Sequence, residues 1–413
     1  FGYRIGELII GFGIIFALVL SLSYFTKKSY KHILLNKYLV IVYTLFLISL
    51  FINNGSLFSL YTYKSSSYIW TASFLLVGII FYDLLDKKYF QISLITIPFI
   101  VYILGTINFP NLIQNFFINY SDKFEFQKAS DLLVVILVCL FTAKYSISDK
   151  KYYIFYFFSI SGLFIPLFLF MSKGSLLAYT FYFLFEIILL LKFFKYNIRQ
   201  LIVGVILGSL MFSFSTLNIW GDFTFTKPQN LFGLMENSSE LTIADKFAEL
   251  YRNKALDFEH PDKIIYIIDG RIYSNDITSN WRLQIWQDVY FDLLNKDQFL
   301  FGYGYNEIIP AMDDVERRGT DGTNEHVHNY FVNIFARGGL VQLLLFIYAY
   351  FMILTKSFEK NYKLYAFQFV ITILLVSFFD SSMESVRFPL IFYFFAGAYL
   401  HKFNKRENIF NGL

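Results

Sequence analysis

The chain has 413 residues, of which 56% are hydrophobic, 22% are aromatic and only 16% are charged, with a formal net charge of +4. A water-soluble protein could not cover so much apolar surface with so few charged side chains. The composition therefore excludes a soluble domain and predicts an all-α polytopic integral membrane protein.

The apolar residues come in blocks of about 16–25, the length that a helix needs to cross about 30 Å of hydrocarbon. No small-residue cleavage site follows the first block, so it is not a cleavable signal peptide. We predict crossings near residues 5–25, 38–62, 69–85, 89–109, 131–147, 152–171, 175–194, 201–217, 338–355, 364–379 and 388–400. Because this number is odd and residue 1 is not Met, we expect a missing or hidden upstream crossing and a total of about 11–12 transmembrane helices.

Lysine and arginine residues fall on every second connection between these crossings. Positive connections stay in the cytoplasm, so the long segment 218–328 is predicted to lie on the outer side. This segment contains 19 acidic and 10 basic residues, whereas the rest of the chain contains 12 acidic and 25 basic residues. The chain accordingly divides into transmembrane helices over 1–217, an outer loop with helical segments over 218–328, and further transmembrane helices over 329–413.

The outer loop is too long for an ordinary connection and too apolar in places to be disordered. Residues 238–255 are predicted to form an amphipathic helix, and residues 264–268 a β-strand or a short buried turn. Asn280 is expected to cap a second helix. The apolar stripe of this helix has four side chains at helical spacing: Ile285, Trp286, Val289 and Leu293.

Arg282 precedes Trp286 by four residues, so it lies on the apolar face of the same helix. A guanidinium directed toward the membrane body needs a partner there. The alternative is that Arg282 stacks on Trp286, or extends along the surface, for packing alone.

Two histidines, His326 and His328, stand where the outer loop returns to the membrane. A new helix is predicted to begin at His328-Asn329, and the field of a helix N-terminus favours an anion and lowers the pKa of an imidazole. His328 is therefore a candidate base beside an anion site. Two alternatives are a structural pair of histidines and a metal site, but a third or fourth metal ligand at suitable spacing is absent from the sequence.

Other polar residues interrupt the apolar pattern on the same side. They lie in the short turn at Ser172-Lys173-Gly174, in the turn over residues 380–387, and at Arg337 in the run that follows the histidines. Cations that converge with a base at one face fit a diphosphate-bearing ligand held for nucleophilic displacement. The candidate ligand-binding residues are Lys173, Arg282, His326, Arg337, Asp380 and Arg387.

The order of these motifs resembles the O-antigen ligase and O-antigen polymerase family of bacterial envelope enzymes. The resemblance rests on His328-Asn329 followed by Gly338-Gly339, on the Ser172-Lys173-Gly174 turn, on Arg282 before Trp286, and on Phe301-Gly302-Tyr303-Gly304. Asp380 resembles an acidic residue of the ligases at the same place. The similarity covers roughly residues 165–400.

The resemblance implies a GT-C-like helical body in the inner membrane, with the active site at the periplasmic face under the loop 218–328. It implies an inverting glycosyltransferase that moves a glycan from an undecaprenyl diphosphate carrier to an acceptor sugar hydroxyl, either lipid A–core in a ligase or a lipid-linked repeat unit in a polymerase. It implies no nucleotide, metal or other cofactor, and no nucleic acid partner; membrane lipid surrounds the protein.

Carried over by position, the resemblance makes His328 the general base and Arg282 the residue that binds the leaving diphosphate. Lys173 takes the place of an arginine that is usual in that turn, and lysine cannot grip a phosphate bidentately. We favour the ligase-like reaction. A transporter or flippase for a lipid-linked sugar is the alternative from another class, but the chain has no repeated half, and its polar groups gather at one face rather than at the midplane. A purely structural protein would not need His328 or Arg282.

Overall fold

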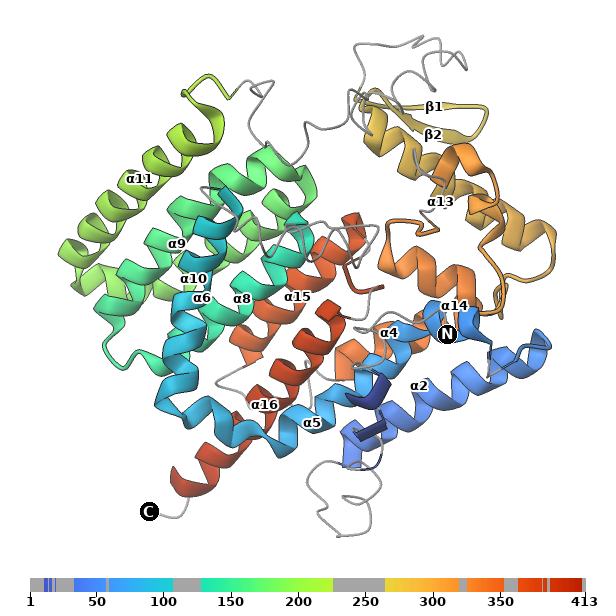
Figure 1. Cartoon of the computed structure of the whole chain (residues 1–413), viewed down its shortest axis with the longest axis horizontal. Coiled ribbons are helices and arrows are strands. Elements are labelled where there is room, and N and C mark those ends of the chain that lie inside the picture. The colour runs from blue at the N-terminus through green and yellow to red at the C-terminus, as the bar shows by residue number, and fades with distance from the viewer. Residues whose placement is uncertain are drawn as a thin grey trace.

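The structure, a computed structural model, describes residues 11–13, 15–16, 19, 33–56, 59–106, 128–225, 264–318, 325–352, 363–380, 382–384 and 387–410. This part of the chain is mostly helical, as the sequence predicts. Figure 1 shows α9 (Lys150–Met171), α10 (Lys173–Tyr196) and α11 (Ile198–Trp220) on one side of the molecule, and α13 (Ile277–Asn295) and α14 (Tyr330–Met352) on the other.

Six of the described helices are long and apolar enough to cross a membrane. They are α6 (Lys88–Thr106), α8 (Ala129–Ser146), α9, α10, α11 and the Tyr330–Tyr348 part of α14. Each coincides with a predicted crossing. The helix α14, however, begins at Tyr330, earlier than the predicted start near residue 338, because two further helical turns precede the break at Gly339.

Four further predicted crossings correspond to shorter apolar helices. These are Ile41–Ile52 within α2 (Ile33–Ile52), Ser67–Ile80, Leu364–Phe379 within α15 (Lys363–Phe379) and Phe388–Tyr399 within α16 (Arg387–Phe410). The first predicted crossing, 5–25, lies almost wholly outside the described residues.

The predicted crossing at 69–85 is not one continuous α-helix. It is divided among α4 (Ser67–Trp70), η2 (Thr71–Ser73), α5 (Phe74–Ile80) and η3 (Tyr82–Asp86), after the short α3 (Leu60–Ser65). Hydroxyl groups in this segment donate to carbonyls three residues earlier, from Thr71 to Tyr68 at 3.1 Å and from Ser73 to Trp70 at 2.7 Å. Such bonds compete with the regular helical pattern and are typical of tighter turns.

The described residues between 264 and 336, which we call the outer segment after their predicted position, have a small hydrophobic core. This core is separate from the large core of the helical body. The four residues of the predicted stripe on α13 are part of it or pack against it. It also includes Trp281, Ile309, Met312, Val327 and Ala336. Because Val327 and Ala336 flank the start of α14, this core attaches α13 to the residues around His328.

The outer segment also contains a β-hairpin, formed by β1 (Ile265–Ile268) and β2 (Arg271–Ser274), with Tyr266 opposite Tyr273. Asp269 and Gly270 at its turn both have positive φ, as a tight two-residue hairpin requires. The strand expected over 264–268 is thus confirmed, although Ile265 and Ile267 are exposed. The amphipathic helix predicted over 238–255 lies outside the described residues.

Candidate functional site

His328 lies where the chain enters α14. Asn329 caps this helix, since its Oδ1 accepts hydrogen bonds from the backbone N–H groups of Phe331 at 2.9 Å and Val332 at 3.1 Å. The predicted helix start is confirmed. His328 itself has a φ of 54°, in the left-handed region that residues other than glycine rarely adopt. Such a conformation persists only where the surrounding structure holds it in place.

Two tryptophans of α13 hold the His328 segment. Trp286 donates from Nε1 to the carbonyl of Val327 at 2.8 Å. The ring of Trp281 meets the imidazole of His328 edge-on, with 5.1 Å between the ring centroids. The position of His328 therefore depends on a helix that lies about 40 residues earlier in the chain.

The helix α13 begins before the residue that the sequence suggested as its cap. Asp276 is the cap: its Oδ1 accepts from the backbone N–H of Ser279 at 2.9 Å. Asn280 is inside the helix, and its Oδ1 accepts from the backbone N–H of Ser274 at 3.2 Å. The prediction of Asn280 as the cap was wrong because its side chain bonds to the hairpin instead.

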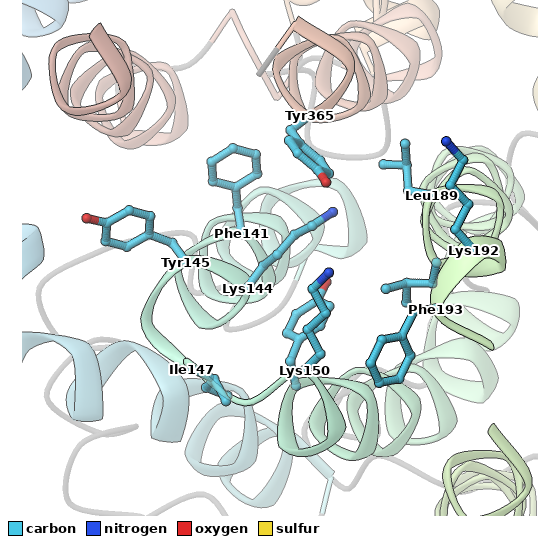
Figure 2. A pocket seen from close by; sticks show the side chains of 11 residues that line it. Phe141, Lys144, Tyr145, Ile147, Lys150, Leu189, Lys192, Phe193 and Tyr365 are labelled. Atoms are coloured by element: carbon cyan, nitrogen blue, oxygen red, sulfur yellow. The ribbon is translucent and has the colours of Figure 1, made fainter. Parts of the chain in front are cut away.

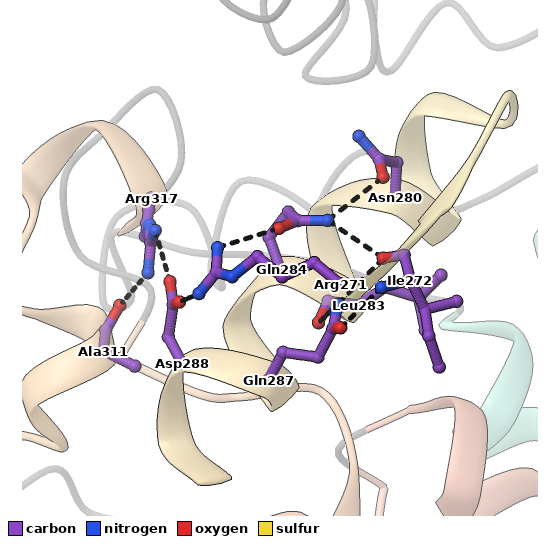
Figure 3. A network of polar contacts seen from close by, with 9 residues as sticks. All are labelled: Arg271, Ile272, Asn280, Leu283, Gln284, Gln287, Asp288, Ala311 and Arg317. Atoms are coloured by element: carbon purple, nitrogen blue, oxygen red, sulfur yellow. Dashed lines mark hydrogen bonds and ion pairs between the residues drawn. The ribbon is translucent and has the colours of Figure 1, made fainter. Parts of the chain in front are cut away.

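A polar network on another face of α13 binds this helix to the hairpin and to η5 (Val315–Arg318), as Figure 3 shows. Arg271 of β2 donates to Gln284 at 3.2 Å and pairs with Asp288. Asp288 also pairs with Arg317 at 2.7 Å, and Arg317 donates to the carbonyl of Ala311 at 3.0 Å in η4 (Pro310–Met312). The network fixes the rotation of α13, so its tryptophans stay directed at the start of α14.

Asp380, directly after α15, joins His328 to the beginning of α8. Its Oδ1 lies 3.7 Å from Nδ1 of His328 and 2.6 Å from Nζ of Lys128. Its Oδ2 accepts a hydrogen bond from Ser130 at 2.7 Å. Three segments that are far apart in the sequence thus meet at one carboxylate.

Burial lowers the pKa of His328, and the cations Lys128 and Arg282 act in the same direction, against the opposing effect of Asp380. Burial also opposes ionisation of Asp380, but its contacts with His328 and Lys128 hold the pKa of this carboxyl well below its usual range. Since His328 is neutral near pH 7, Lys128 is the cation that keeps Asp380 ionised there. The result is an imidazole that can accept a proton beside a fixed carboxylate.

Arg282 lies in the same electrostatic environment. Burial lowers the pKa of its guanidinium, while the carboxylates of Asp380 and Asp276 favour the charged form, and an arginine remains a cation under such conditions. Its buried Nε has no hydrogen-bond partner among the described residues. An unpaired buried donor costs about 1–3 kcal/mol, so an anionic ligand that accepts from Arg282 would be favoured.

Lys173 is the first residue of α10, and its Nζ lies 2.9 Å from Oδ2 of Asp276, the cap of α13. Its side chain is 86% exposed. The neighbouring Gly174 approaches Phe379 so closely that an added Cβ would lie 2.7 Å from the Cβ of Phe379. This contact places the start of α10 beside Asp380.

Charges consequently alternate at this end of the helical body, from Lys173 to Asp276, Arg282, Asp380 and Lys128. We call these five residues together with His328 the His328 cluster. The side chain of Lys173 is exposed, and Nε of Arg282 has no hydrogen-bond partner within the described part of the chain. These are the donors that an anion would engage.

His326 faces a second carboxylate of the same turn. Its Nδ1 lies 3.2 Å from Oε2 of Glu384, which is almost fully buried, whereas the His326 side chain is 48% exposed. The two histidines of the His-x-His motif therefore contact two different acids, Asp380 and Glu384, four residues apart.

Arg337 and Arg387 are placed differently from the cluster. Arg337 is buried, and its guanidinium donates to the carbonyls of Gly304 and Glu307 and to the hydroxyl of Tyr61. These contacts hold the loop after α13, so the expected substrate-binding role of Arg337 stays a prediction. Arg387 is the first residue of α16; its side chain is outside the described part of the chain.

The segment that contains Gly302 and Gly304 contacts the segment that contains Gly338 and Gly339. At Gly339 the helix α14 is broken, with a φ of 68° and a ψ of −170°, and an added Cβ would lie 2.3 Å from the carbonyl of Leu300. Four backbone hydrogen bonds join the segment 299–304 to this break: Tyr303 to Ala336 and Gly304 to Arg337, then Leu340 to Phe299 and Val341 to Leu300. The two motifs thus form one structural unit next to the His328 cluster.

The sequence argument missed two members of the cluster, Lys128 and Asp276. Lys128 lies just before the predicted crossing 131–147, on the side that the lysine pattern assigns to the outer face, so the topology contained a signal for it. Among the described residues, no three His, Cys, Asp or Glu side chains gather as a metal site would require; metal independence remains a prediction.

Comparison with protein families gives one match: a family model described as O-antigen ligase matches residues 157–347. The matched range contains Lys173, Arg282 and His328, whereas Lys128 and Asp380 lie outside it. None of the curated proteins and none of the solved structures matches the chain.

Proposed function

Since residues 157–347 match the O-antigen ligase family model and six described helices are long and apolar enough to cross a membrane, we propose that the protein is an inverting glycosyltransferase of the bacterial envelope. It transfers a glycan from an undecaprenyl diphosphate carrier to an acceptor sugar hydroxyl. The observation that carries the proposal is the neutral His328 beside the incompletely paired Arg282 in one cluster.

His328 is the general base of the proposed reaction. With Nδ1 directed at Asp380, the proton of the neutral imidazole resides on Nδ1, and Nε2 is the nitrogen that accepts the proton of the acceptor hydroxyl. The oxygen of this hydroxyl forms a bond to the anomeric carbon of the donor sugar. The bond from that carbon to the diphosphate oxygen breaks, and the carrier diphosphate leaves with the electron pair on the face opposite the attack.

Arg282 and Lys173 stabilise the charge of the leaving diphosphate. Arg282 supplies a partly buried guanidinium, whose charge acts more strongly where water is excluded. Lys173 is exposed and pairs with Asp276, and such surface pairs contribute only about 0–1 kcal/mol. A diphosphate can therefore take Lys173 from Asp276 at little cost.

Asp380 and Lys128 position the base in this proposal. The carboxylate of Asp380 selects the Nδ1–H form of His328, and Lys128 at 2.6 Å keeps the carboxylate ionised and in place. The cluster faces the periplasm in the proposed topology, because it lies at the helix ends opposite the lysine-rich connections.

The acceptor distinguishes a ligase from a polymerase, and we propose the ligase. Deletion of the gene, followed by analysis of the surface polysaccharide, tests the proposal. We expect bare lipid A–core, with polymer left on the carrier. Core that bears a single repeat unit would instead identify a polymerase, and unchanged polysaccharide would contradict both.

A further inference from the structure

A second polar site lies at the opposite end of the helical body from the His328 cluster. A cavity of about 360 Å³ opens between the end of α8, the start of α9, the second half of α10 and the start of α15. Lys173 and Lys192 are both on α10, and at 1.5 Å per residue they are about 28 Å apart along the helix. The cavity therefore cannot belong to the glycan-transfer site.

Three lysines line this cavity, one from each of three helices: Lys144, Lys150 and Lys192. Figure 2 shows the amines of Lys144 and Lys150 directed into the space between the helices, with Lys192 along the facing wall. Aromatic rings form much of the remaining wall, including Phe193 and Tyr365. The lining thus combines a concentrated positive charge with an apolar surface.

Among the described residues, only one of the three lysine charges in the cavity has an ion-pair partner. Lys144 pairs at 2.7 Å with the buried Glu186, which also accepts from Tyr153 and Gln368. Lys150 and Lys192 have no ion-pair partner among the described residues, and Lys150 lies over the ring of Phe193 at 5.8 Å. The cavity therefore has a local excess of two positive charges.

We propose that this cavity binds a phosphate group, most simply the headgroup of an anionic membrane lipid from the leaflet at this end. A phosphodiester supplies the missing negative charge and can accept hydrogen bonds from all three amines. The volume lies within the range of small-molecule sites, and basic pockets between transmembrane helices are typical sites for anionic headgroups. The aromatic wall suits the glycerol and the first methylenes of such a lipid.

The test compares two pairs of substitutions that remove the same charge from the same helices. Lys150→Gln with Lys192→Gln removes the two unbalanced cations of the cavity. Lys151→Gln with Lys195→Gln is the matched control, since these lysines of α9 and α10 do not line the cavity. Native mass spectrometry of the purified protein, titrated with phosphatidylglycerol, phosphatidylcholine or inorganic phosphate, measures binding.

We expect one phosphatidylglycerol to bind in preference to phosphatidylcholine, with an affinity that falls by about 30-fold in the cavity variant and stays unchanged in the control. Binding that inorganic phosphate does not displace assigns the site to a lipid. Saturable binding of phosphate itself, lost in the cavity variant, assigns it to free phosphate. Equal binding by the wild type and the cavity variant, with both folded by their thermal unfolding midpoints, would overturn the proposal whatever the fate of the transferase assignment.

Discussion

At the scale of single residues, the two histidines are two residues apart but have different surroundings. His328 packs against Trp281, with 17% of its side chain exposed, and faces Asp380, whereas His326 is half exposed and faces Glu384. Burial lowers the pKa of His328, which also lies near the cations Lys128 and Arg282. The two histidines of the His-x-His motif thus differ: His328 is the candidate base, and His326 is a partly exposed residue next to it.

We predict that His328→Ala lowers the rate of glycan transfer by roughly 10²–10⁴-fold, the usual cost of a lost general base, while donor binding remains. His326→Gln, which keeps an N–H donor for Glu384, should lower the rate far less. Transfer by purified protein from a lipid-linked donor measures both. Full activity of His328→Ala would end the assignment of the base.

Substitution of Arg282 should weaken binding of the lipid-linked donor rather than remove the general base. Arg282→Ala is expected to lower kcat/KM for the lipid-linked donor by roughly 10–100-fold, since it removes charged hydrogen bonds to the diphosphate. Arg282→Lys should restore only part of this loss, because an ammonium cannot bind two oxygens in the fixed geometry of a guanidinium. If Arg282→Ala and wild type bind the donor equally well, Arg282 serves packing against the tryptophans of α13.

The charges around His328 determine the pH below which glycan transfer should be lost. Because burial lowers the pKa of His328, activity should persist below the ordinary histidine pKa of about 6.5 and be lost as the pH falls through the lowered value. Lys128→Gln removes a cation that lowers this pKa, so the acid limb should move to higher pH. Asp380→Asn removes an anion that raises it, so the limb should move to lower pH, with a reduced plateau. Shifts in the same direction for both variants would contradict the arrangement.

At the scale of elements, the sequence predicted the existence of helices better than their ends. The apolar stripe of α13 was readable because four side chains repeat at helical spacing, and all of them pack on the outer core. Its cap was misread because Asp276 and Asn280 are both good caps, and only the hairpin, a tertiary partner, decides between them. The meeting of Lys128 with Asp380 could not be predicted, since it depends on how helices about 250 residues apart pack.

The break in α14 leads to a prediction at this scale. Gly339→Ala forces a Cβ against Leu300 in a conformation that is essentially restricted to glycine. We expect it to lower both the thermal unfolding midpoint and the transfer activity. Gly221→Ala is the control: Gly221 also has a positive φ, of 79°, but nothing lies within 4 Å of an added Cβ.

The control should therefore lose only the cost of a left-handed residue, about 1–2 kcal/mol, and keep its activity. Equal effects of Gly339→Ala and Gly221→Ala on the unfolding midpoint would mean that the contact with segment 299–304 does not contribute to stability.

At the scale of the whole molecule, the alternating lysines predict that the hairpin and the lysine-rich connections lie on opposite sides of the membrane. A cysteine placed at Asp269 should react with a membrane-impermeant thiol reagent added outside the cytoplasmic membrane, and one at Ser148 should not. The native Cys139 is buried and should give no background. Labelling at Ser148 alone would reverse the orientation and remove the periplasmic site.

The backbone hydrogen bonds between segment 299–304 and the break at Gly339 have a consequence for the insertion and folding of the protein. Lipid offers no partners for the backbone groups that the break exposes, so they need the protein itself. These partners come from the segment 299–304, which in the predicted topology must first cross to the outer side and then fold back against the membrane. We therefore expect α14 to reach its final depth only after the outer segment has matured, so that an immature transferase would lack a properly seated His328 and could not react with carrier-bound sugars.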